Sequence, residues 1–165
     1  MTVEEQTDWI AFIRDVYKHA TSIGKHERRP VFHSPAELRA IIKCEKRLNV
    51  TFPTPLKNLL LQTNGVSELL TTTNKEIDTG YFLYSIEGIL EINSSLRSQD
   101  FNMPLDCLLF FAGDGMGDYF GFAVVKGKVP HSRIYFWDHE DDSRQSIAPS
   151  LGYFIENWKL GKIRV

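Results

Sequence analysis

The spacing of apolar residues changes once along this chain, near Leu105, and this change limits the choice of fold more than any single motif does. Before it, apolar side chains recur every three or four residues, which is typical of helices with one buried face. This pattern predicts helices over residues 4–22, 35–49, 54–64 and 86–96. After it, short apolar runs alternate with turn residues, which is typical of strands.

The second half predicts an antiparallel sheet. Apolar runs indicate strands at residues 108–112, 118–125 and 133–137, with a further short strand at 145–148. An earlier short strand is expected at 81–84, and Pro149 opens a last helix. Helices in the first half and strands in the second predict the α+β class, and the C-terminal strands are expected to form an antiparallel meander. We expect residues 1–165 to form a single domain, since domains of about 100–200 residues are usual.

Three segments carry weaker signals. The basic stretch 25–30 follows Gly24 and is interpreted as a solvated loop after the first helix. The polar, threonine-rich stretch 68–79 is interpreted as a surface loop. Ser34-Pro35-Ala36-Glu37 has the form of a capping box, in which Ser and Glu side chains bond to free backbone N–H groups at a helix start.

Composition narrows the possible partners and the compartment. The formal net charge is −2, and direct binding to nucleic acid would need a basic excess, so a neutral or basic protein partner fits better. The start of the chain is acidic and resembles no secretion signal, and no apolar run reaches the roughly 18 residues that span a bilayer. We therefore expect a cytoplasmic protein without membrane contact, whose Cys44 and Cys107 are reduced, buried thiols.

Two loops are the candidates for chemistry. The Gly-rich loop 113–118 has neither the spacing of a dinucleotide or phosphate loop nor that of a calcium-binding EF-hand. We interpret it as a tight connection between strands, in which aspartates bond to local N–H groups; a ligand or metal site is the alternative. The acidic run 138–142 is interpreted as a solvated turn. No cofactor, metal site or catalytic residue is predicted, and the chain is not expected to be an enzyme.

Three groups of residues, taken in order, resemble the SUKH superfamily, which includes the yeast cell-wall-assembly regulator and many bacterial toxin-immunity proteins. The first group is Glu45, Leu48, Phe52-Pro53, Leu59-Leu60 and Asn64-Gly65; the second is Gly113-Asp114-Gly115 with Gly117-Asp118-Tyr119; the third is Ile134–Glu140 with Ser150–Phe154. The resemblance spans about residues 36–158, preceded by an N-terminal helix and basic loop over 1–30. The chain departs from the family's pattern at Phe52, where Leu is usual, and at Leu56, where an aromatic residue is common.

The resemblance implies an α+β domain with a mixed, largely antiparallel sheet flanked by helices. It also implies a bacterial immunity protein, or antitoxin, which neutralises a cognate toxin, such as a nuclease domain, by direct contact. Acidic groups would steer the encounter with a basic toxin surface, and one or two aromatic side chains would anchor it. The candidate partner-binding residues are Asp114, Asp118, Asp138, Glu140, Asp141 and Asp142. A general interaction module that scaffolds regulators is the alternative, and an enzyme with a metal or phosphate ester at Asp114 and Asp118 is the third.

Overall fold

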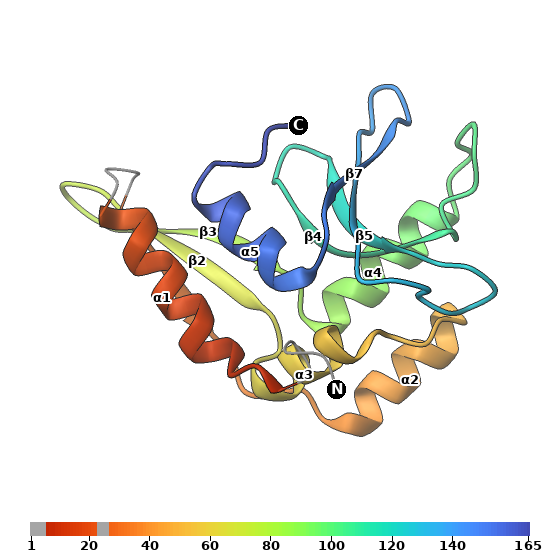
Figure 1. The fold of residues 1–165 in the computed structure, drawn as a ribbon, viewed down its shortest axis with the longest axis horizontal. Helices are drawn as coiled ribbons and strands as arrows, with labels where there is room; N and C mark the ends of the chain where they lie inside the picture. The colour runs from red at the N-terminus through yellow and green to blue at the C-terminus, as the bar shows by residue number, and fades with distance from the viewer. Residues whose placement is uncertain (1–5, 23–26) are drawn as a thin grey trace.

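The computed structural model describes residues 6–22 and 27–165, and these residues form five helices and seven strands (Figure 1). The helices are α1 (Trp9–Ser22), α2 (Leu38–Leu48), α3 (Thr54–Gln62), α4 (Ile86–Arg97) and α5 (Leu151–Lys159). The strands are β1 (Arg28–Phe32), β2 (Val66–Thr71), β3 (Glu76–Leu83), β4 (Leu108–Gly113), β5 (Tyr119–Ala123), β6 (Ile134–Trp137) and β7 (Arg144–Ala148).

The seven strands form one sheet in chain order, and every neighbouring pair is antiparallel. Among the described residues, a parallel contact occurs only as an isolated bridge between Thr51 and Lys128, outside the named strands. The predicted α+β class is thereby confirmed, and the antiparallel meander extends beyond the C-terminal half. Antiparallel neighbours need only short connections, so consecutive strands can pair as the chain proceeds.

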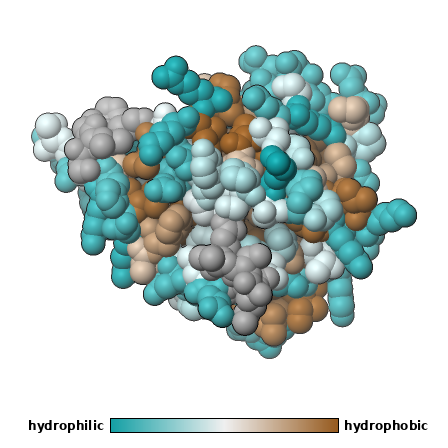
Figure 2. Space-filling model, viewed as in Figure 1, coloured by the Kyte–Doolittle hydropathy of each residue, from teal (hydrophilic) through white to brown (hydrophobic). Residues whose placement is uncertain are grey.

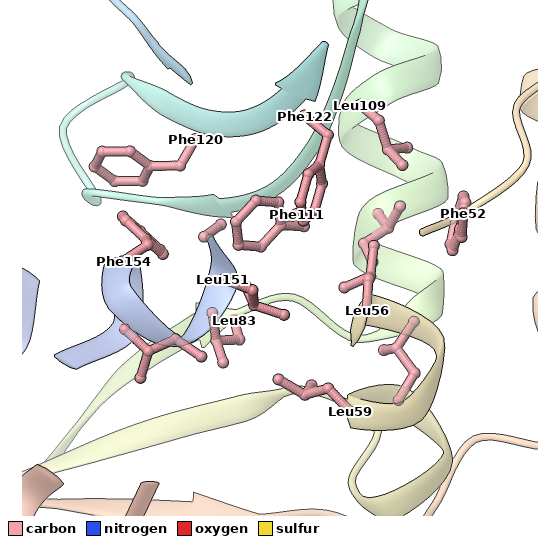
Figure 3. Packing of buried hydrophobic residues seen from close by; sticks show 14 of the residues in the cluster. Phe52, Leu56, Leu59, Leu83, Leu109, Phe111, Phe120, Phe122, Leu151 and Phe154 are labelled. Carbon is pink, nitrogen blue, oxygen red and sulfur yellow. The ribbon is translucent and has the colours of Figure 1, made fainter. Parts of the chain in front are cut away.

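Alternating residues of the meander face two separate hydrophobic clusters. Leu109 and Phe111 of β4 belong to the main core, where the Phe111 ring lies 5.7 Å from that of Phe154 in α5 (Figure 3). Leu108 and Phe110 point the opposite way, into a smaller cluster that lies toward the C-terminal part of α4. Because side chains alternate along a strand, β4 is buried on both faces, as its continuous apolar run predicted.

The two expected surface loops in the first half are partly strands instead. The basic stretch 25–30 overlaps β1, although residues 23–26 lie outside the described residues. The stretch 68–79 contributes to β2 and β3. An ion pair of 2.7 Å joins Arg29 of β1 to Glu76 of β3, on either side of β2. The first six residues of β3 are exposed, so this part of the sheet lacks the apolar alternation that sequence reasoning requires. Backbone pairing, rather than side-chain burial, defines these strands.

The helix starts show which end signals operate. The predicted capping box at Ser34 is wrong: α2 begins after Glu37, and no side chain caps it. The backbone of this segment is held instead by α3 and its following turn, since Ala36 N donates to Leu60 O at 2.9 Å and Asn64 N donates to Ser34 O at 3.2 Å. Ser85, by contrast, caps α4, because its hydroxyl accepts from the N–H of the third helical residue.

The two cysteines differ in environment. Cys44 is buried in the main core, as expected, and burial raises the pKa of its thiol to about 11. Cys107 is exposed, which contradicts the expectation of two buried thiols, and its sulfur lies 3.0 Å from a guanidinium nitrogen of Arg144. Both thiols are free. The raised pKa argues against Cys44 as a nucleophile, because the thiolate is the reactive form.

Candidate binding surface

The candidate surface is built from two loops that the meander brings to the same end of the sheet. The β4–β5 loop covers residues 114–118 and the β6–β7 loop covers 138–143. They meet through Asp118, whose Oδ1 accepts from the backbone N–H of His139 at 3.0 Å and lies 2.7 Å from its Nδ1. The structure therefore brings together the acidic residues that are separated by about twenty positions in the sequence. We call these two loops the acidic end.

The β4–β5 loop is a tight connection held by Asp114. Its Oδ1 accepts from the backbone N–H groups of Met116 at 2.7 Å and Asp118 at 3.2 Å. Gly115 and Gly117 have φ values of 84° and 112°, which side chains disfavour. This confirms the interpretation of the loop as a structural connection. It also leaves the side chain of Met116, 82% exposed, at the tip.

The β6–β7 loop contains two further carboxylates that bond to nearby backbone. Asp138 Oδ1 accepts from Glu140 N at 2.7 Å, and Asp141 Oδ1 accepts from Ser143 N at 2.8 Å. The side chains of Glu140 and Asp141 are exposed, whereas Asp138 is half-buried. Glu140 and Asp141 are thus the acidic groups most open to a partner.

Asp142 has an internal role that its sequence neighbours do not share. Its Oδ1 accepts from Trp137 Nε1 at 2.7 Å and from Arg144 at 2.9 Å, and its Oδ2 accepts from Met103 N at 3.2 Å. Burial by itself raises the pKa of the Asp142 carboxyl, but the hydrogen bonds from Trp137 and Arg144 outweigh it and hold this pKa below its usual range. Asp142 ties the loop to the segment before β4, and little of its side chain remains for a partner.

His139 gives the acidic end a titratable group near neutral pH. The hydrogen bond to Asp118 raises the pKa of His139, with smaller contributions from the charges of Glu140 and Asp138. Asp118, Asp138 and His139 also offer ligand atoms within 4.8 Å of one another, a spacing at which a cation can bind. Exposed acidic groups often gather without an ion, and here Asp118 is already bonded to His139.

A second polar feature lies beneath the acidic end and was missed by sequence reasoning. Glu68 of β2 is 5% exposed, and its carboxylate accepts a hydrogen bond from the Tyr17 hydroxyl. The same carboxylate lies 2.5 Å from Lys159 Nζ and 3.2 Å from Arg28 Nη1. We call these four residues the Glu68 cluster. It joins α1, β1, β2 and α5, and its residues line a cavity of about 340 Å³ that Asp114 also borders.

The charges within the Glu68 cluster depend on one another. Burial by itself raises the pKa of the Glu68 carboxyl. The charge and hydrogen bond of Lys159, the hydrogen bond from Tyr17 and the charge of Arg28 outweigh burial, so this pKa lies below its ordinary value. Burial also raises the pKa of Tyr17, and Glu68 adds to this increase. The cluster therefore holds an ionised carboxylate against an ammonium, with the phenol neutral. No alternation in the sequence marks Glu68 as inward, because Val66, Ser67 and Glu68 are all buried and the pairing of β2 with β3 shifts register on both sides of Ser67 and Glu68.

The acidic loops, the tight glycine connection and the all-antiparallel meander define a class of small α+β domain that carries two acidic loops at one end of its sheet. The chain matches the family model SUKH_6, described as SMI1-KNR4 cell-wall, over residues 39–155. It belongs to this family, as the resemblance predicted, and the family supports a role in protein interaction. No curated protein is significantly similar to the chain in sequence. No helix among the described residues is long and apolar enough to cross a membrane.

Proposed function

We propose that this chain is an immunity protein that binds a cognate toxin, such as a nuclease domain, through its acidic end. The observation that carries the proposal is the convergence of the two acidic loops, joined by the Asp118–His139 contact, around exposed carboxylates. An enzyme that binds nucleic acid presents a basic surface to the phosphate backbone. An acidic surface can compete for that basic site and speed the encounter.

The six candidate residues contribute to this proposal in different ways. Glu140 and Asp141 face solvent and are suited to direct contact. Asp114 and Asp142 shape the loops from within, so their substitution would disturb the surface rather than only its charge. At the tip of the β4–β5 loop, Met116 offers an apolar anchor, where an aromatic side chain was expected. Methionine adapts to varied partners because its side chain is flexible and polarisable.

Affinity capture of the tagged chain from its host, followed by mass spectrometry, tests the proposal. One stoichiometric protein with a toxin domain supports it and supplies the partner for binding assays. Glu140→Lys with Asp141→Lys should then weaken binding at least tenfold, as should Met116→Ser if it anchors the contact. Glu91→Lys, an exposed charge reversal on α4, is the matched control. Unchanged affinity in the double reversal would exclude the acidic end as the interface.

A regulatory interaction module is the second candidate, and the cell-wall description of the matching family favours it. In this case the capture would return several regulators rather than one toxin. The acidic-end variants and the Glu91→Lys control test whether the acidic end is the interface for a toxin or for a regulator, because they change the surface of this chain whichever partner binds it.

A further inference from the structure

α2 and the β5–β6 turn lie at the opposite end of β5 from the acidic end (Figure 1). A groove lies between them. It has a volume of about 420 Å³, and its lining includes Ile42 and Lys46 from α2 and Lys126 and Lys128 from the turn. Three exposed cations line it: Lys46, Lys126 and Lys128. We call this surface the cationic groove.

The charges of the cationic groove are not neutralised within the protein. Among the described residues, none of its three cations forms an ion pair. The carboxylate of Glu45 also lines the groove, but it is already engaged, since it accepts from Phe52 N at 2.6 Å and lies 2.8 Å from Lys57 Nζ. Lys46 stands in the last turn of α2, where cations stabilise the helix dipole. Lys126 and Lys128 lie in the β5–β6 turn, outside any helix.

Lys126 occupies a backbone conformation that suits other residues better. The hairpin closes with Val125 N bonded to Lys128 O at 2.8 Å and the reverse bond at 3.0 Å. Its two central residues, Lys126 and Gly127, have φ values of 49° and 73°, which is a type I′ turn. Asn, Asp or Gly is preferred at the first of these positions, so a lysine there costs stability. Positions that break a local rule in this way are typical of functional sites.

Backbone contacts tie the two sides of the groove together. Thr51 N donates to Gly127 O at 2.8 Å, which fixes the turn against the residues that follow α2. A side chain at Gly127 would approach Asn49 O to within 2.9 Å, so this close contact requires glycine. A preformed surface loses less conformational entropy on binding than a flexible one.

Aliphatic side chains accompany the cations. Leu38 and Ile42, one turn apart on α2, are 54% and 42% exposed, and Val125 is 56% exposed. Figure 2 shows hydrophobic atoms over α2 and over the β5–β6 turn. Single-stranded nucleic acids are held by aromatic rings that stack on bases, and none of these three side chains is aromatic. Apolar side chains ringed by charges are typical of protein interfaces.

We propose that the cationic groove binds an acidic segment of a partner protein, with carboxylates on the lysines and an apolar side chain against Ile42 and Val125. This surface is separate from the acidic end, so the chain can contact two proteins, or two parts of one protein, at the same time. The proposal does not depend on the toxin assignment.

The test is a titration of the isotope-labelled full chain, followed by NMR, with a ten-residue peptide that contains four Glu and two Leu residues. Amide shifts should be confined to residues 42–51 and 125–128. Lys126→Asn should raise the melting temperature of the protein, because Asn suits the turn. The same substitution should weaken the binding of the peptide by about two- to fivefold, as expected for the loss of one exposed ion pair. Lys75→Asn, an exposed lysine in the β2–β3 turn, should leave the affinity unchanged.

Several results would overturn the proposal. One is the absence of saturable shifts at millimolar peptide, and another is shifts that map to other surfaces. Equal affinity of the parent and Lys126→Asn would also overturn it. So would oligothymidine or phosphatidylserine vesicles that bind the groove as tightly as the peptide, since the site would then select charge alone rather than a protein segment.

Discussion

Glu68→Gln removes one charge from the Glu68 cluster and keeps the shape of the side chain. In the parent protein, Glu68 Oε1 lies 2.5 Å from Lys159 Nζ, and the Lys159 side chain is only 12% exposed. The substitution leaves this ammonium without its counter-charge in a site with little water. Removing one partner of a buried pair costs about 3–5 kcal/mol. Arg28 is 42% exposed, so solvent screens it and its lost contact adds at most about 1 kcal/mol.

Urea unfolding at neutral pH, followed by tryptophan fluorescence, measures this cost. The expected loss corresponds to a decrease in melting temperature on the order of 10 °C for a domain of this size. Lys159→Met removes the cation instead, and the double variant Glu68→Gln/Lys159→Met removes both charges. We expect the double variant to be more stable than Glu68→Gln alone, because no charge is then left buried without a partner.

The pH dependence has a defined direction. Because the pKa of Glu68 in the folded state lies below its ordinary value of 4.5, its stabilisation is fully present above that value. It is lost as the pH falls through the lower folded pKa, so the difference between the parent and Glu68→Gln should shrink only below about pH 4.5. A cost below about 1 kcal/mol, or a double variant whose cost equals the sum of the single costs, would refute the reasoning.

Three further predictions concern single contacts. Asn93→Leu should cost about 3 kcal/mol in urea unfolding, because it leaves the buried N–H and C=O of Phe110 without their partner; a neutral result would contradict this. Asp118→Asn should lower the pKa of His139 toward its ordinary value of 6.5, as measured by NMR titration. In the parent protein, His139 contributes to stability below pH 6.5, and this contribution is lost as the pH rises through the higher pKa of the folded state. Ser85→Ala should cost about 1 kcal/mol in thermal unfolding, whereas Ser85→Gly should cost less.

The parts of the fold that could be predicted from sequence are those where burial imposes a period. Residues 108–112 read as a buried strand because both faces of β4 are covered. The helices were found because each has one apolar stripe. The boundaries were less certain: α1 begins at Trp9 rather than at the predicted residue 4, although residues 1–5 lie outside the described residues.

The parts that were missed depend on contacts between distant residues. β1 pairs with β2 across about forty positions, and neither the polar β3 nor the basic start of β1 carries an apolar alternation. Glu68 looked like a loop residue because its partners, Tyr17 and Lys159, lie 51 and 91 positions away. At the acidic end, sequence identified the charged residues but not that Asp142 bonds inward. Exposure depends on the three-dimensional neighbours of a side chain, which local patterns do not contain.

The unbroken chain order of the sheet places the acidic end and the cationic groove on separate connections of the chain. The connections on either side of β5 emerge at opposite ends of a strand only five residues long. Substitutions or insertions in the β4–β5 and β6–β7 loops can therefore alter one end while the β5–β6 turn and α2 keep their geometry, since surface loops tolerate change better than the elements they connect. In a meander of this kind, the residues of the acidic end can change while the cationic groove keeps its shape.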